Sequence, residues 1–174
     1  GDWITLTDGS IDGTVQDITL TTVKVKQGDN SIATVSPQTL VNGSFLNWKD
    51  MLEGGGRRVK KVVYFDVRSI RIADDNLKKN LLAKGYVKEE DLKGDVINIG
   101  LFRHYMEHYL SKREDVNPKM TLLLRQLDAT QAGVPIEFYF FLSNKDWVPY
   151  EHSTSDILGH VYAYAHEFGL KIYQ

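Results

Sequence analysis

Two histidines in a predicted helix have the clearest metal-binding chemistry in the chain. His104 and His108 are four residues apart, the spacing at which two imidazoles on one helix face bind zinc. A metalloprotease of this kind needs glutamate directly after the first histidine, but Tyr105 stands there. The apolar periodicity of residues 98–112 also turns both histidines toward solvent. We therefore predict no metal site for this pair; the alternative, a metal-dependent hydrolase, would require a third ligand from another element of the chain.

A second segment resembles the start of a calcium-binding loop. In Asp8–Gly13, oxygen-bearing residues alternate along the chain and a glycine occupies the sixth position. Such a loop also needs a bidentate carboxylate at its twelfth position, where this chain has Thr19. Its flanks are strand-like, whereas a calcium loop of this kind lies between helices. The segment is predicted to be a turn between two strands.

Three glycines followed by four cations form a third candidate, at Gly54–Lys61. A phosphate-binding loop of this composition lies between a strand and a helix, so that backbone N–H groups converge on the anion. Here the glycines lead into an apolar strand. We predict a linker at a domain junction, whose cations cap carbonyls or meet acidic groups. An electrostatic role of these cations at a water-filled cavity is the alternative.

Several other function classes are excluded by composition. The 174 residues include no cysteine, which rules out disulfides, thiolate catalysis and cysteine-ligated zinc. A net charge of -2 predicts no general affinity for polyanions, so nucleic-acid binding would have to come from a local basic patch. No Gly-x-Ser-x-Gly elbow occurs, and the aromatic run Ile136–Leu142 lacks the basic opening of an RNA-binding sheet. We predict a protein that is not an enzyme and has no cofactor, metal or nucleic-acid partner.

The first 48 residues read as short β-strands rich in β-branched residues. Valines and lysines alternate in Val23–Lys26, with the period of two that is typical of a half-buried strand. Pro37 ends the last strand or begins a turn, because it cannot donate to a ladder. The expected strands are 3–6, 13–15, 18–20, 22–26 and 31–35. They predict a small Sm-like five-stranded barrel or sandwich over residues 1–53.

Residues 57–174 are predicted to form a second, α+β domain. Asn98 is the expected N-cap of a helix that ends near Lys112, and Ser153 or Thr154 that of a second helix, which Gly169 stops. The expected strands are 59–67, 120–127, 136–142 and 170–173. The order β-α-β-β-α-β is that of a ferredoxin-like sandwich. The charged stretch near 74–94, with a helical patch at Leu77–Leu82, is predicted to be a surface insertion.

An ordered set of motifs in the first 48 residues resembles the β domain of MscS-like mechanosensitive channels. The set reads Gly1-Asp2-x-Ile4, Gly13-Thr14-Val15, Ile18, Thr22-Val23, Asp29, Ile32, Val35, Pro37 and Phe45-x-Asn47-Trp48. The chain departs from the family pattern at Ser36-Pro37-Gln38, where an aliphatic residue usually precedes the proline and asparagine often follows it.

The second half resembles the miniconductance (YbdG-type) branch of that family. The matching motifs are Gly55-Gly56-Arg57-Arg58, Asn98-Ile99-Gly100-x-Phe102-Arg103, Leu124-Arg125-Gln126-Leu127, Trp147, Tyr150-Glu151 and Phe168-Gly169-Leu170. Together the two regions cover nearly the whole chain except the stretch near 74–94.

The resemblance implies the water-exposed part of a channel that opens under membrane tension and relieves hypo-osmotic stress. It implies a homo-heptamer in a bacterial inner membrane, with membrane helices upstream of Gly1 and this region enclosing a cytoplasmic vestibule. No stretch of the chain itself approaches the roughly 20 apolar residues of a membrane span. The residues we expect to matter for structure and assembly are Gly1, Asp2, Gly13, Asp29, Pro37, Phe45, Asn47, Trp48, Arg57 and Arg58.

Two further expectations concern association and the alternative function. A five-stranded module of under 50 residues buries little surface, so lateral pairing in a ring would stabilise it and protect its edges. Without the upstream helices we expect this chain to be monomeric or weakly associated. The alternative is a soluble ring-forming module that binds a small molecule or RNA, and it rests on fold analogy alone.

Overall fold

The computed structural model describes residues 1–173 and divides the chain into two compact units, Gly1–Gly54 and Gly55–Gln174. Each unit has a hydrophobic core of its own. They are described separately below.

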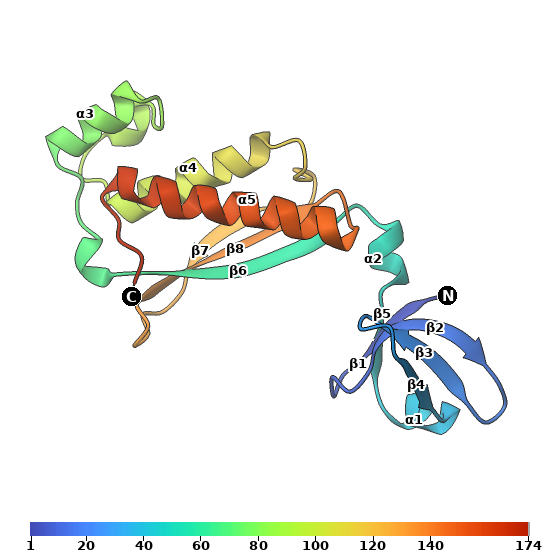
Figure 1. Ribbon diagram of the computed structural model, residues 1–174. Helices are drawn as coiled ribbons and strands as arrows, with labels where there is room; N and C mark the ends of the chain where they lie inside the picture. Colours follow the sequence, from blue (N-terminus) through green and yellow to red (C-terminus); the bar gives the residue numbers. More distant parts are fainter. Residues whose placement is uncertain (174) are drawn as a thin grey trace. The chain divides into compact units, whose positions relative to one another are not determined.

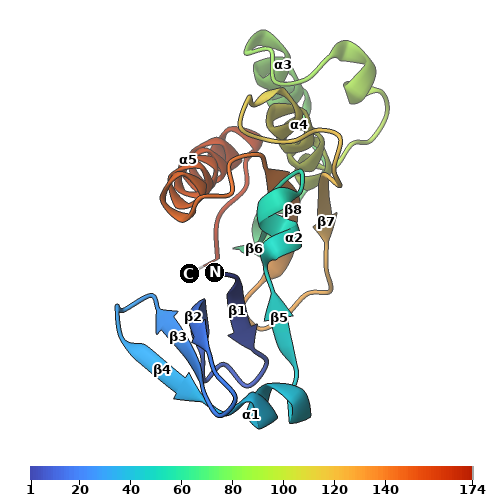
Figure 2. The ribbon, with the colours of Figure 1, turned by 90° about the vertical axis from the view of Figure 1, so that its right-hand side faces the viewer.

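The first unit is one open antiparallel sheet, with strands in the order β4-β3-β2-β1-β5 (Figure 2). β2 is long and contains a bulge between Val15 and Asp17. Two short helices lie in the same unit, and Ser36 caps the first of them while Pro37 takes its first position. The elements are β1 (Trp3–Leu6), β2 (Asp12–Ile18), β3 (Val23–Gln27), β4 (Ile32–Val35), α1 (Pro37–Asn42), β5 (Phe45–Asn47) and α2 (Lys49–Glu53).

The predicted α+β class is confirmed, but the sheet of the first unit does not close into a barrel. β4 and β5 each pair on one side only, because α1 occupies the connection between them and both strands are short. The expected strand 13–15 lies within β2, which continues through a bulge to Ile18; of the expected strand 18–20, only Ile18 is in a strand. The fifth strand is β5. It has only three residues, too few for a period-of-two pattern to be recognised in the sequence.

The core of the first unit is small. Its buried apolar side chains alternate along the central strands, with Val25 0% exposed and Val23 2% exposed. The full set of buried residues is Ile4, Leu6, Ile11, Val23 and Val25. Five buried side chains give this unit little hydrophobic stabilisation of its own.

The second unit packs two long helices on one face of a three-stranded antiparallel sheet in the order β6-β8-β7 (Figure 1). Alternate residues of β8 point at the helices and are fully buried, as Phe138 and Phe140 are. The elements are β6 (Arg57–Phe65), η1 (Val67–Ser69), α3 (Asp75–Ala83), η2 (Glu89–Leu92), α4 (Asn98–Lys112), β7 (Leu123–Gln126), β8 (Val134–Leu142), α5 (Trp147–Ala165) and η3 (His166–Phe168).

The sheet has the ferredoxin-like order, but its fourth strand is reduced to one bridge. Ile172 pairs with Phe65 at the outer edge of β6. The Tyr173 N–H also donates to the Tyr64 carbonyl at 2.9 Å. The expected strand over 170–173 is therefore represented by this short antiparallel contact rather than by a full ladder.

Asn98 is a buried hub and not the N-cap of α4, which is Ile97. The Asn98 side chain accepts from the Arg71 N–H and donates to the carbonyls of Ser69 and Phe168, each at 2.9 Å. It is 0% exposed. Three backbone groups from two separate segments, 69–71 and Phe168, thus find their partners in one buried amide, which a solvent-facing cap would not do.

The second long helix begins six residues before the predicted cap. α5 starts at Trp147, and Pro149 lies in its first turn, where a missing N–H costs no helix bond. Thr154 is buried inside the helix and donates to the Tyr150 carbonyl at 2.8 Å. Gly169 ends the helical region with φ 73°, as expected.

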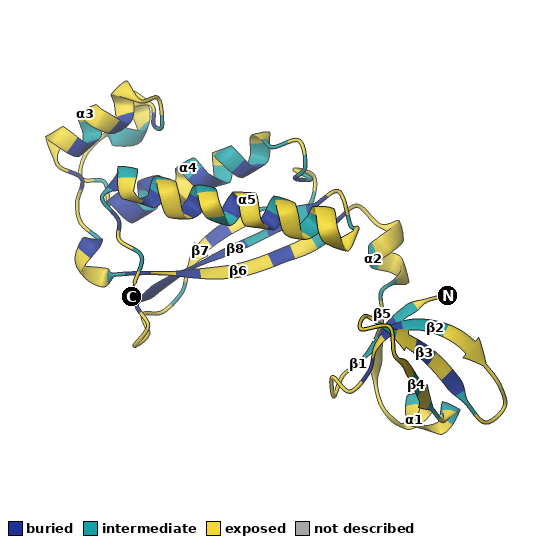
Figure 3. Cartoon of the chain, in the orientation of Figure 1, coloured by how far each residue is buried: buried dark blue, intermediate teal, exposed yellow. Residues whose placement is uncertain are grey.

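The 74–94 stretch is more than a surface insertion. Its helix α3 is capped by Asp74, whose carboxylate accepts from the Leu77 N–H at 2.7 Å. Leu77 and Leu81 are buried in the same core as the long helices. Figure 3 shows α3 as a mostly exposed helix with intermediate and buried stretches along it. The five lysines of the stretch suggest a solvent-exposed segment, so the sequence pattern did not indicate the buried leucines.

Candidate functional site

The first unit carries an aromatic clasp between its N-terminal strand and the segment after β5. The rings of Trp3 and Trp48 stack with centroids 5.1 Å apart. The Trp48 indole donates to the Thr5 hydroxyl at 2.9 Å, and that hydroxyl donates to the Asp12 carboxylate at 2.9 Å. The Trp3 indole donates to the same Asp12 oxygen at 2.5 Å. The clasp is a continuous hydrogen-bonded chain that ties the two ends of the unit together.

Two expected site residues complete this end of the sheet. The Asn47 amide donates to the Asp2 carboxylate at 3.0 Å, and the Asn47 side-chain oxygen accepts from the Lys49 N–H. Gly1 is exposed next to them, and Phe45 is 41% exposed on β5. The structure thus brings Asp2 next to Asn47 and Trp48, although Asp2 and Asn47 are 45 residues apart in the sequence.

The other expected residues of this unit lie in turns or in close strand contacts. Asp29 accepts from both the N–H and the hydroxyl of Ser31, and these bonds hold the pKa of Asp29 below its usual value. Asp8 makes the equivalent pair with Ser10, so its oxygens serve a turn and not a cation. At Gly13, a Cβ would lie 2.2 Å from the Lys26 carbonyl oxygen, so β2 and β3 require glycine there.

The cations after the glycine run are bound to aromatic rings of the second unit. The Arg57 guanidinium lies 4.4 Å from the centre of the Tyr150 ring and donates to the Lys145 carbonyl at 3.2 Å. The Tyr150 hydroxyl donates in turn to the Arg58 carbonyl at 2.6 Å. These contacts join the start of β6 to the start of α5, and the arginines do not converge on a phosphate-sized site.

An aromatic ladder between α4 and α5 is the most ordered polar cluster that the sequence reasoning missed. The His160 ring lies between Tyr109 and Tyr164, with centroid distances of 3.7 and 3.8 Å and interplanar angles of 8° and 12°. Its Nε2 is 2.9 Å from the Tyr105 hydroxyl. The i, i+4 spacing of 105/109 and 160/164 on two expected helices was the available signal.

The surroundings of His160 favour its neutral form. Burial lowers the pKa of His160, and the positive charge of Arg113 lowers it further. Arg113 is held by two bonds to Asp115 and by the Tyr109 hydroxyl at 2.8 Å. Burial also raises the pKa of Tyr105, so this phenol stays protonated next to the imidazole.

The two histidines with zinc-like spacing lie one turn apart on α4. His104 and His108 are both exposed on α4, as expected from the helical pattern. The nearest acid to His104 is Asp91, 3.8 Å away from its Nε2. Within residues 1–173, no group of three metal-ligating side chains comes together.

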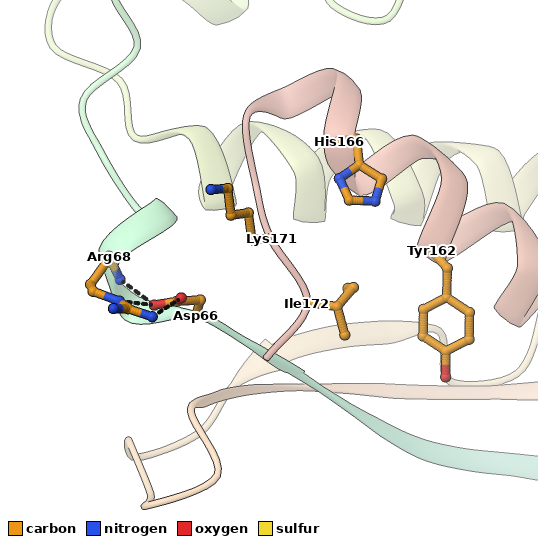
Figure 4. A pocket seen from close by; sticks show the side chains of 6 residues that line it. All are labelled: Asp66, Arg68, Tyr162, His166, Lys171 and Ile172. Carbon is orange, nitrogen blue, oxygen red and sulfur yellow. Dashed lines mark hydrogen bonds and ion pairs between the residues drawn. The ribbon is translucent and has the colours of Figure 1, made fainter. Parts of the chain in front are cut away.

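An open cleft lies near the C-terminal end of the described chain (Figure 4). It measures about 730 Å³ and is lined by Asp66, Arg68, Tyr162, His166, Lys171 and Ile172. Asp66 is bound to Arg68 by two hydrogen bonds, at 3.0 and 2.7 Å, and this partner lowers the pKa of Asp66 to about 2. The Asp66 carboxylate thereby offsets the positive charge of Arg68 within the cleft.

The first unit carries a recognisable family pattern. Residues 1–50 match the β-domain of mechanosensitive ion channels. The clasp, the glycine contact and the open sheet described above all lie within these 50 residues. No helix among the described residues is long and apolar enough to cross a membrane.

Solved channel structures share the fold of the whole chain. A cryo-EM structure of Arabidopsis thaliana MSL1 is similar with a TM-score of 0.69 and 12% identity, and it covers 100% of this chain and 52% of its own. The crystal structure of Helicobacter pylori MscS in a closed state gives a TM-score of 0.61 and 11% identity, covering 99% of this chain and 54% of its own. The chain thus spans about half the length of these channels.

Proposed function

We propose that the chain is the cytoplasmic part of a mechanosensitive channel of the small-conductance type. The observation that carries the proposal is the β-domain match over residues 1–50, joined to a fold that follows channel structures from end to end. Both similar structures are channels, not enzymes. In the full protein, membrane tension opens a pore formed by segments outside this chain, and this part forms the vestibule below it.

Assembly into a ring is the second element of the proposal. The β-domain leaves both sheet edges, β4 and β5, without a partner strand. These edges carry apolar side chains, with Ile32 51%, Phe45 41% and Leu46 50% exposed. Unpaired edges with apolar residues are suited to strand or side-chain contacts with a neighbouring copy. We infer a homo-heptamer in a bacterial inner membrane, with Gly1, Asp2 and the Trp48 clasp forming the end that continues toward the membrane.

The miniconductance branch is the most specific form of the proposal. It is supported by the motifs Gly55–Arg58 and Asn98–Arg103 in the second unit. Residues of these motifs have defined contacts: the Arg57 guanidinium lies over the Tyr150 ring, and the Asn98 side chain binds three backbone groups. A smaller pressure-activated current than that of a small-conductance channel would support this assignment.

The test is survival of hypo-osmotic shock. The gene that encodes this chain, with its complete coding sequence, is expressed in a bacterial strain that lacks its own mechanosensitive channels. We expect rescue of survival and pressure-activated currents in membrane patches. A frameshift control before the first codon for this chain should give neither. A protein that reaches the membrane but gives no current at any pressure short of rupture would overturn the proposal.

A further inference from the structure

The sheet of the second unit has one face that no helix covers. α4 and α5 lie on the opposite face (Figure 1), and β6 is largely exposed (Figure 3). Because side chains alternate along a strand, a defined set points away from the helices. We call this set the open sheet face; it includes Arg58, Lys60, Val62 and Tyr64 on β6, Leu123 on β7 and Tyr139 on β8.

The open sheet face is more apolar than a water-facing sheet usually is. Val62 and Tyr64 are each 37% exposed, and Leu123 is 40% exposed. The solvated face of an antiparallel sheet normally carries polar side chains. Apolar and aromatic groups gathered on such a face mark a site of interaction with another surface.

The charge of this face is positive. Its acid, Glu137, is only 5% exposed and is bound to Arg125 at 2.9 Å, so these two charges offset each other. Arg58 lies 5.6 Å from the centre of the Tyr139 ring. Arg58 and Lys60 are exposed and take part in no ion pair within residues 1–173. Two cations therefore stand beside apolar groups with no acid to balance them.

The β-domain of the same chain has the complementary charge. Residues 1–54 contain seven acidic and three basic side chains, a net charge of -4, whereas residues 55–174 have a net charge of +2. All seven acids are exposed, and no ion pair in the described chain includes any of them. Asp17, Asp50 and Glu53 also make no side-chain hydrogen bond there.

We propose that the open sheet face binds the acidic β-domain of a second copy of this chain, head to tail. The inference rests on the proposed self-assembly and adds to it a contact separate from the β4 and β5 edges. Each copy then carries one surface of each kind, and a heterologous contact of this type closes into a ring when its rotation allows. Apolar groups provide the contact area, and the opposite charges select the partner and speed the encounter.

The test exchanges the charges on the two surfaces of the 174-residue chain. Self-association is measured by sedimentation equilibrium at low and at high salt. Arg58→Glu with Lys60→Glu reverses the open sheet face, and Asp50→Lys with Glu53→Lys reverses the acidic surface. We expect each pair to weaken association at least about tenfold, because like charges then meet. Lys79→Glu with Lys112→Glu, on exposed helix positions, matches the net charge change of the first pair and should leave association unchanged.

Two mixtures make the test specific. Combining both pairs in one chain should restore association, and so should mixing the two separately reversed chains, since every contact is again complementary. Circular dichroism checks that each variant is folded. Failure of both restorations, a wild-type chain that stays monomeric at low salt, or binding of Arg58 and Lys60 to anionic vesicles in place of a second copy would overturn the proposal. If the full protein still gives pressure-activated currents with either reversed pair alone, the proposed contact is ruled out and the channel function is not.

Discussion

At the scale of single residues, Gly13 is the glycine of residues 1–54 at which an added Cβ would come nearest to a neighbouring backbone atom. A methyl group there would meet the carbonyl oxygen and carbon of Lys26, at 2.2 and 2.7 Å, in the neighbouring strand. Gly13→Ala is expected to lower the free energy of unfolding of the β-domain by about 1–3 kcal/mol, because the strand must shift. Urea unfolding followed by fluorescence measures the change. Gly28→Ala is the matched control, since nothing lies within 4 Å of its Cβ, and an equal loss in both variants would contradict the explanation.

His160 provides a pH-dependent prediction at the same scale. Its folded-state pKa is lowered, chiefly by burial, so the unfolded chain binds the proton more readily. The stability that comes from neutral His160 is present above the unfolded pKa of roughly 6.5 and is lost as pH falls below it toward the folded pKa. His160→Phe keeps a stacked ring and should flatten the fall in thermal stability between about pH 7 and 5. His152→Gln, exposed on the same helix, should leave the slope unchanged.

At the scale of secondary structure, the informative element is α3. Its place in the charged stretch suggested a surface flap, yet Leu81 is 0% exposed within the common core. Leu81→Ala is expected to cost about 2–5 kcal/mol of unfolding free energy, as for other fully buried leucines. Leu82→Ala, one residue on and 37% exposed, should cost far less. Urea denaturation followed by the helical circular dichroism signal distinguishes the two. A negligible effect of Leu81→Ala on the unfolding free energy would show that α3 does not contribute to the common core.

At the scale of the whole molecule, the two units have separate cores of very different size. Five buried apolar residues support the β-domain, whereas the core of the second unit includes both long helices and α3. We expect two unfolding transitions in urea, with the β-domain first. Trp3 and Trp48 report on the β-domain, and the helical signal reports on the second unit. Trp147→Phe removes the only tryptophan outside the β-domain. Coincident transitions would show that the units unfold together.

The sequence by itself determined the elements that local pattern controls. The alternation in Val23–Gln27, the apolar stripe of α4 and the stop at Gly169 reflect side-chain period and backbone freedom, which act over a few residues. The ordered motifs from Gly1 to Trp48 likewise indicated the β-domain before any contact was known.

Only the tertiary structure decided which distant groups meet. The position of Asn98 in the sequence predicts a cap, but backbone groups from two separate segments bind its side chain, which lies in the core. The His160 ladder needs two helices in register, and the open sheet face exists because both helices pack on the same side. Such outcomes depend on burial and long-range contact, which local pattern does not contain. The sequence also did not decide between a closed barrel and an open sheet in the first unit. Pairing between strands on either side of a connection is a long-range property.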